Sequence, residues 1–158
     1  MLQRIQTVYL LLAIALIALS MTLPLAFYSN IIQGQQFNYT VLGFLQPQDD
    51  FAKGFNSLPL FIFAAISILL SLVTVFSFKK RKFQLSLSTF NIVAVLFYIG
   101  ILAYYFSNVI TAGNAGNNVS VSLKYPLTFP AIALIFILLA MRSIKKDENL
   151  VKSLDRLR

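Results

Sequence analysis

Four long apolar stretches restrict what this chain can fold into more than any other feature of its sequence. Each is long enough to cross roughly 30 Å of hydrocarbon as an α-helix, which rises about 1.5 Å per residue. The first three contain no Asp, Glu, Lys or Arg, and the fourth carries Arg142 near its end, where a long side chain can reach the membrane surface. The predicted spans cover approximately Val8–Tyr28, Leu58–Phe78, Leu87–Phe106 and Tyr125–Ile144. The predicted fold is therefore an all-α membrane protein, a bundle of four transmembrane helices within residues 1–144.

The composition supports this fold class. The chain has 158 residues, of which 58% are hydrophobic and 11% charged, whereas soluble domains are usually about a quarter charged. A soluble core of this size could not hide so much apolar surface, but a bilayer can.

The positive charges fall on one side of the predicted spans. Eleven of the thirteen Lys and Arg residues lie before the first span, between the second and third, or at the end of the fourth and beyond it: Arg4, Lys79, Lys80, Arg81, Lys82, Arg142, Lys145, Lys146, Lys152, Arg156 and Arg158. The other two loops carry only Lys53 and Lys124, which Asp49 and Asp50 balance. Because Lys and Arg are enriched in cytoplasmic loops, both termini are predicted to be cytoplasmic. The net charge of +8 is thus a topology signal, and no nucleic-acid partner is expected, because no binding motif accompanies it.

The start of the chain allows two interpretations. Arg4, the apolar run that follows it and the small residues Ala18 and Ser20 fit a cleavable signal peptide. However, the apolar run continues past Ser20 to Tyr28, which is the length of a span rather than of a signal sequence. The segment is therefore expected to be retained as the first span.

Two segments between spans, on the side opposite the termini, alternate apolar and polar residues. Phe37, Tyr39 and Val41 alternate in the first loop, and Val119, Val121 and Leu123 in the second. This period is typical of half-buried strands, so a small two-stranded sheet is predicted on that side. The alternative is two irregular loops in which the alternation is accidental.

Residues 145–158 are predicted to form an amphipathic cytoplasmic tail, which either continues the fourth helix or forms a surface helix. Leu150, Leu154 and Leu157 recur at spacings of four and three, which gives one apolar stripe on a helix. Such a helix can lie on the membrane surface or dock on a partner, and the alternative is a frayed, solvated tail. The candidate partner-binding residues are Lys146, Asp147, Glu148, Leu150, Val151, Leu154, Asp155 and Arg156.

Candidate chemistry is almost absent. The sequence has no His and no Cys, and shows no glycine-rich phosphate loop and no cluster with metal-ligand spacing. Asn91 is the most polar residue within a span and is expected to bond across to another helix. Ser67, Ser71 and Thr74 share one face of the second span, where small hydroxyl residues allow close packing. No cofactor, metal site or enzymatic activity is therefore expected.

The two ends of the chain carry sequences similar to those of a known family. The chain opens with Gln3-Arg4-Ile5-Gln6-Thr7, and its tail contains Lys146-Asp147-Glu148, Leu150-Val151 and Asp155-Arg156-Leu157-Arg158. This pair of motifs resembles an uncharacterised family of small four-span bacterial inner-membrane proteins. The resemblance implies the topology and a location in the bacterial inner membrane, and it implies no catalytic residues.

Two classes of function follow from these features. The first is a non-enzymatic accessory or scaffold subunit of a larger inner-membrane complex, because the spans lack ionisable residues and the tail is motif-like. The alternative is a small-molecule or lipid transporter or channel, which would need a polar path through Asn91 and the hydroxyl face of the second span. The expected partners are membrane lipids and other membrane proteins. The Lys79–Lys82 link serves as a topology anchor or, alternatively, as a contact for anionic lipid.

Overall fold

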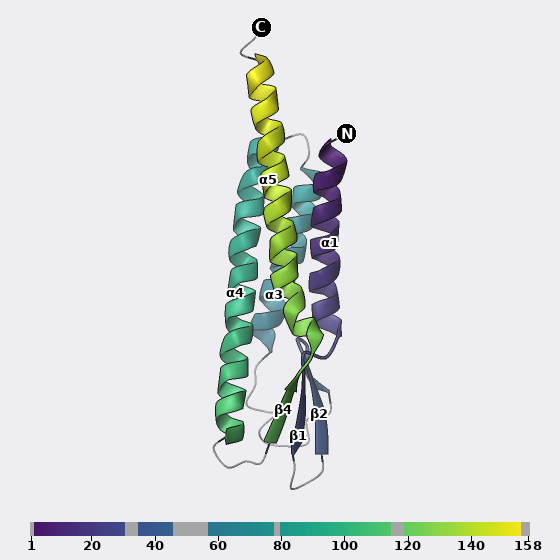
Figure 1. Ribbon diagram of the computed structural model, residues 1–158, viewed down its shortest axis with the longest axis vertical. Coiled ribbons are helices and arrows are strands. Elements are labelled where there is room, and N and C mark those ends of the chain that lie inside the picture. Colours follow the sequence, from purple (N-terminus) through teal and green to yellow (C-terminus); the bar gives the residue numbers. More distant parts are fainter. Residues whose placement is uncertain (1, 31–34, 46–56, 78–79, 115–118, 156–158) are drawn as a thin grey trace.

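Four long helices and one small sheet make up the computed structural model, which describes residues 2–30, 35–45, 57–77, 80–114 and 119–155 (Figure 1). The helices are α1 (Leu2–Thr22), α3 (Leu58–Phe76), α4 (Arg81–Asn114) and α5 (Phe129–Asp155), with a 3₁₀ helix, η1 (Tyr125–Thr128), leading into α5. The strands are β1 (Ala26–Asn30), β2 (Gln35–Thr40), β3 (Gly43–Leu45) and β4 (Val119–Leu123). Both chain termini lie at one end of the bundle, here called the termini end, and the strands lie at the other, the sheet end (Figure 1).

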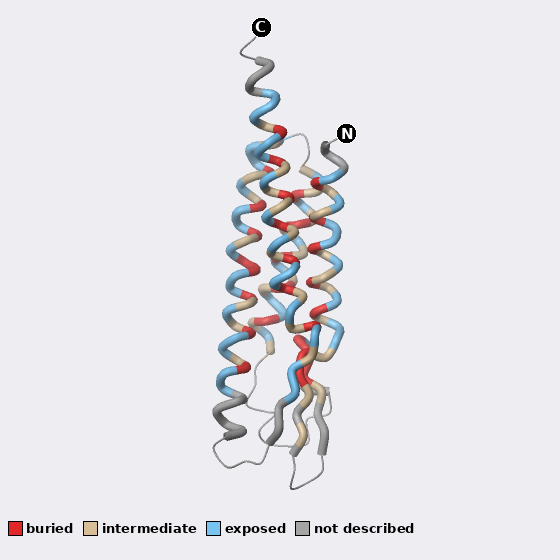
Figure 2. The backbone as a smooth tube through the Cα atoms, in the orientation of Figure 1, coloured by how far each residue is buried: buried red, intermediate tan, exposed pale blue. Residues whose placement is uncertain are grey.

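Each helix buries one narrow stripe of side chains, in which the spacing alternates between four and three residues. This is the spacing of helices that pack nearly parallel along a common axis, with side chains fitting between those of the neighbour. In Figure 2 the buried positions recur along the inner side of the bundle. They include Gln6, Leu10, Ala13, Ile17 and Ser20 in α1; Leu60, Ala64, Ser67, Ser71 and Thr74 in α3; Gln84, Ser88, Asn91, Val95, Tyr98 and Leu102 in α4; and Ala133, Ile137, Ala140, Ile144 and Asp147 in α5.

The helices form a ring in which α1 packs against α5 and α3, and α4 packs against α3 and α5. Helices α3 and α4 are antiparallel neighbours, because they are joined by a link of only a few residues and contact each other extensively. Across the diagonal of the ring, Ser20 of α1 and Tyr98 of α4 share a hydrogen bond of 3.2 Å.

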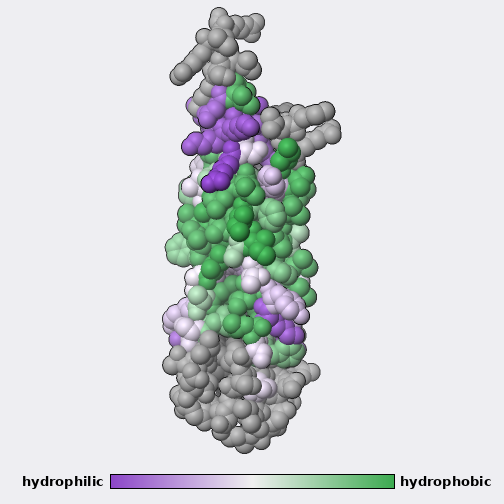
Figure 3. Space-filling view, in the orientation of Figure 1, coloured by the Kyte–Doolittle hydropathy of each residue, from purple (hydrophilic) through white to green (hydrophobic). Residues whose placement is uncertain are grey.

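The chain is a multi-pass membrane protein. All four helices are long and apolar enough to cross a membrane. Their outward faces carry large apolar side chains that are widely exposed, such as Leu69, Phe90 and Phe97. Figure 3 shows hydrophobic surface over the middle of the helices, with a hydrophilic patch near the termini end. Such a surface would be unfavourable in water, and it matches a hydrocarbon environment.

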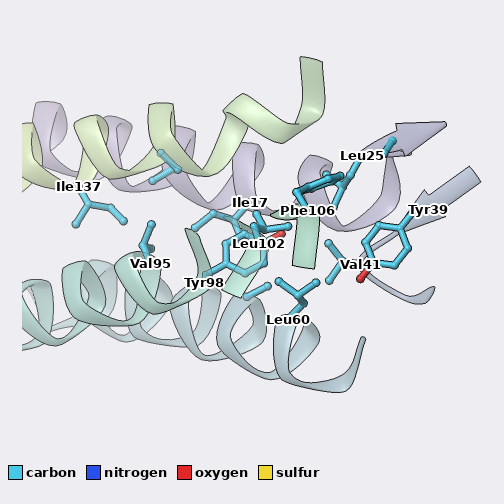
Figure 4. Close-up of a cluster of buried hydrophobic side chains, with 14 residues drawn as sticks. Ile17, Leu25, Tyr39, Val41, Leu60, Val95, Tyr98, Leu102, Phe106 and Ile137 are labelled. Atoms are coloured by element: carbon cyan, nitrogen blue, oxygen red, sulfur yellow. The ribbon is translucent and has the colours of Figure 1, made fainter. Parts of the chain in front are cut away.

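The apolar part of the core lies toward the sheet end and continues into the sheet. Ile17, Leu60, Tyr98 and Leu102 pack between the helices, and Tyr39 of β2 extends the same cluster (Figure 4). The rings of Tyr39 and Phe106 meet edge to face, with their centroids 6.4 Å apart. The sheet is therefore packed onto the end of the bundle.

The first span ends earlier than predicted. Helix α1 stops at Thr22, and residues 26–28, which the hydropathy pattern assigns to the same span, belong to strand β1. Pro24 follows the last helical turn directly and cannot continue the helix, because it lacks an N–H and its ring clashes with the preceding turn. The prediction that the span continues to Tyr28 is therefore wrong.

The predicted small sheet is present, but it has four strands rather than two. Its strands are antiparallel in the order β3-β2-β1-β4. The two segments recognised by their alternation become β2 and β4, and they do not pair with each other because β1 lies between them. Leu25, just after the C-terminal end of α1, continues this arrangement: its N–H donates to the backbone oxygen of Tyr39 at 2.7 Å, and its oxygen accepts from the N–H of Lys124 at 3.0 Å.

Candidate functional site in the polar half of the bundle

Most of the polar side chains buried among the helices gather in the half of the interior near the termini end. They are Gln6 in α1, Ser67, Ser71 and Thr74 in α3, Gln84, Ser88 and Asn91 in α4, and Asp147 in α5. All eight occupy the same stripe of positions that carries apolar side chains toward the sheet end. The interior is thus mainly apolar toward the sheet end and richer in polar side chains toward the termini end.

Asn91 joins α4 to α3 through both ends of its amide. Its side-chain oxygen accepts a hydrogen bond of 2.6 Å from the Ser67 hydroxyl, and its Nδ2 donates one of 2.6 Å to the Ser71 hydroxyl. All three side chains are at least 99% buried. This geometry agrees with the interhelical contact expected for Asn91, and the hydroxyl face of α3 supplies both partners.

Gln84 closes the end of the α3–α4 pair. Its Nε2 donates a 3.0 Å hydrogen bond to the backbone oxygen of Thr74, in the last turn of α3. Carbonyl groups in the last turn of a helix have no partner within the helix, so this bond satisfies a group that would otherwise be buried alone. The Ser88 hydroxyl donates to the backbone oxygen of Gln84 at 2.9 Å and holds its own side chain within α4.

Asp147 brings three helices together at the termini end. Gln6 of α1 donates a hydrogen bond from Nε2 to Asp147 Oδ2. Arg81, the first residue of α4, donates from Nη1 to the backbone oxygen of Asp147 at 3.1 Å. Asp147 is only 7% exposed, and among the described residues its second carboxylate oxygen, Oδ1, has no hydrogen-bond partner. The two sequence motifs at opposite ends of the chain therefore meet at one buried carboxylate.

Sequence reasoning placed Asp147 with the partner-binding tail and did not connect it with Gln6. The signal was present in the spacing, because the stripe Ala133, Ile137, Ala140, Ile144 reaches Asp147 at its next step of three. Helix α5 continues without a break past Ile144, where the fourth span was predicted to end, to Asp155, so the described part of the tail continues the fourth helix.

Of the other candidate partner-binding residues, Lys146 and Leu150 line one pocket on the surface of α5. Lys146 is exposed and Glu148 is partly buried, while the side chains of Leu150 and Val151 are 46% and 39% exposed. Leu154 and Asp155 belong to α5, but their side chains lie outside the described part of the structure, as does the whole of Arg156. Lys79 in the link is also outside the described residues.

Two pockets open on the outer surface rather than in the interior. One, of about 380 Å³, is an apolar groove along α4 around Gly100, lined by residues from Val93 to Tyr104. The other, of about 410 Å³, lies on α5 at the termini end and is lined by Arg142, Lys145, Lys146, Asn149 and Leu150. In the part of the chain that the structure describes, no three His, Cys, Asp or Glu residues come together as metal ligands would.

Four membrane-crossing helices, a small sheet at one end and an interior whose polar groups bond to one another define a small multi-pass membrane protein. The chain belongs to the family described as Domain of unknown function (DUF4293), whose model matches residues 2–157. This match covers nearly the whole chain and confirms the resemblance to an uncharacterised family that the two end motifs suggested. Among curated proteins, no match to this chain is found.

Proposed function

We propose that this chain is a non-enzymatic accessory or scaffold subunit of a larger protein complex in the bacterial inner membrane. The observation that carries the proposal is the Asn91 amide, because its oxygen and its nitrogen are both bonded to side chains of the neighbouring helix. A transporter needs polar groups that can exchange partners with a solute along a path. In this chain the Asn91 amide is instead hydrogen-bonded at both ends to α3, so it holds two helices together.

The packing of the interior supports the same proposal. Leu10, Ala13 and Ile17 of α1 and Ile137 of α5 are fully buried on the inner stripes. Because close-packed side chains leave little room for a solute, the groups available to other molecules are those on the outer surface.

The exposed end of α5 is the surface that best fits a protein partner. Helix α5 continues past the other helices at the termini end (Figure 1). Leu150 and Val151 lie on this extension and are exposed. This is unusual, because the face of a helix that points into water normally carries polar residues. An amphipathic helix of this kind can lay its apolar side chains in a groove of another protein.

Co-purification tests this proposal. The full chain, expressed at its native level and extracted in mild detergent, should retain a membrane-protein partner in fixed stoichiometry. The double variant Leu150→Ser/Val151→Ser should lower the retained partner by at least about tenfold, since burying each aliphatic side chain contributes roughly 1.5–3 kcal/mol. Both positions lie beyond Asp147, so the Gln6 bond stays in place.

The matched control is Phe83→Ser, which removes an exposed apolar side chain from the first turn of α4 at the same end. It should leave the partner bound. Loss of the partner in both variants would indicate a general effect of surface polarity, and a chain that purifies alone with lipid would contradict the scaffold proposal.

We also propose that the termini end faces the cytoplasm. Lys80, Arg81 and Lys82, with Arg142, Lys145 and Lys146, place the described positive charge mainly at that end, and Lys and Arg are enriched in cytoplasmic loops. The chain contains no cysteine, so single cysteines report on one position each. In intact spheroplasts, a membrane-impermeant maleimide should label the variant Ser122→Cys on β4. It should label Lys82→Cys only after the membrane is permeabilised, and the reverse pattern would overturn the orientation.

A further inference from the structure

The pocket on α5 at the termini end is basic and sits where a membrane surface would lie. Arg142, Lys145, Lys146 and Asn149 follow the spacing of one helix face and are all exposed. Asp147 lies on the opposite, buried side of the helix, bonded to Gln6. Three cations therefore share one face of two turns of helix. Like charges three and four residues apart on a helix repel, so a bound anion would relieve this repulsion.

The same face of α5 becomes apolar directly toward the sheet end. Ile132, Ile135 and Leu138 are exposed, and they precede Arg142 at helical spacing. Ile132 and Arg142 are separated by roughly 15 Å along the helix at about 1.5 Å per residue, which is about half the thickness of the hydrocarbon core. Figure 3 shows the hydrophilic patch over α5 directly beside hydrophobic surface.

We propose that this face binds one anionic glycerophospholipid, with its phosphate in the pocket formed by Arg142, Lys145, Lys146 and Asn149 and its acyl chains along Leu138 and Ile135. The Arg142 guanidinium supplies a planar pair of N–H donors for phosphate oxygens. The two lysines add positive charge, and the Asn149 side chain can hydrogen-bond to the headgroup. A free phosphate would use only the basic part of this face, whereas a phospholipid uses the basic and the apolar parts together.

Native mass spectrometry of the full chain in detergent tests the site. Phosphatidylglycerol should be retained in preference to phosphatidylcholine, which has no net charge. The double variant Lys145→Gln/Lys146→Gln should weaken retention of phosphatidylglycerol by roughly tenfold or more, since each cation near an anionic lipid contributes about 1 kcal/mol. The comparison variant Lys80→Gln/Lys82→Gln removes the same charge from the Lys79–Lys82 link, the other candidate contact for anionic lipid. If the lipid is held on α5, this variant should change retention less than about threefold.

Three results would overturn the proposal. Equal weakening in both double variants would mean general attraction to charge. Displacement of the lipid by equimolar inorganic phosphate would mean a simple anion site. Preference for an acidic peptide, polyglutamate, over phosphatidylglycerol would mean a protein-binding surface.

A second measurement does not depend on any variant folding correctly. Phosphatidylglycerol with a photoreactive group in its acyl chain should cross-link the wild-type protein mainly to the α5 segment that contains Ile135 and Leu138. Cross-links that are spread evenly over the outward faces of all four helices would count against a defined site. The inference does not depend on the scaffold proposal, because the protein partner is absent from both measurements.

Discussion

Replacing Gln6 with leucine is expected to lower the free energy of unfolding by about 2–4 kcal/mol, the largest effect of any single polar substitution in the bundle. The substitution removes the donor that bonds Asp147 Oδ2, and Oδ1 already lacks a partner among the described residues. Within the described part of the chain, both oxygens of the buried Asp147 carboxylate would then lack a hydrogen bond. Unfolding of the detergent-solubilised protein, followed by circular dichroism over a denaturant titration, measures the change.

A double variant separates the lost hydrogen bond from general damage to the packing. Gln6→Leu/Asp147→Leu replaces both members of the pair by apolar side chains of similar size, and it should recover most of the lost stability. The reason is that an unpaired buried polar group costs more than a pair that has been removed altogether. If the double variant is as unstable as Gln6→Leu alone, the hydrogen bond is not the source of the effect.

Replacing Asn91 with leucine is expected to lower the free energy of unfolding by about 1–3 kcal/mol. Hydrogen bonds between helices in a membrane contribute about 0.6 kcal/mol on average and up to about 1.7 kcal/mol each, and this substitution removes two. The Ser67 and Ser71 hydroxyls can turn back to carbonyl groups of their own helix, which limits the loss. The same denaturant titration measures it.

The control for Asn91 is Thr89→Leu, two residues earlier on α4. Thr89 is exposed and its hydroxyl bonds only within the helix, to the backbone oxygen of Leu85 at 3.1 Å. It should change the free energy of unfolding by less than about 0.5 kcal/mol, as surface substitutions usually do. Equal losses in the free energy of unfolding for Asn91→Leu and Thr89→Leu would show that α4 tolerates neither substitution. The hydrogen bonds of the Asn91 amide would then not explain the effect.

The elements that could be predicted are those in which one physical cause is dominant. The four spans follow from hydropathy, since nothing else explains stretches of that length without charge. The bond of Asn91 to another helix was expected from the cost of leaving an amide unbonded in hydrocarbon. Its partners Ser67 and Ser71 were not, because the hydroxyl face of the second span was interpreted as a surface for close packing.

Strand β1 was missed because its first residues do not differ in hydropathy from the helix before them. Ala26, Phe27 and Tyr28 are as apolar as the helix before them, so hydropathy joins them to it. Strand β3 was missed for a different reason. The β2–β3 hairpin turns through Val41 and Leu42, and neither is a residue that marks a tight turn.

Asp147 was misplaced because an acid close to Lys145 and Lys146 is normally solvated. Only the position of Gln6, which is 141 residues away in sequence, makes its burial favourable. The spacing along α5 indicates that Asp147 is buried, but its contact with Gln6 depends on how the first and last helices are aligned, and local sequence does not carry that information.

The pairing of β1 with β4 and the bond between Gln6 and Asp147 fasten the first helix to the last at both ends. During synthesis, therefore, α1 enters the membrane long before its principal neighbour exists. The order of assembly follows: α3 and α4 can pair early as a local hairpin, and the molecule closes only when β4 and α5 have emerged. Contacts between residues so distant in sequence form slowly. The Gln6 amide therefore lacks its native hydrogen-bond partner until α5 has been synthesised and has packed against α1.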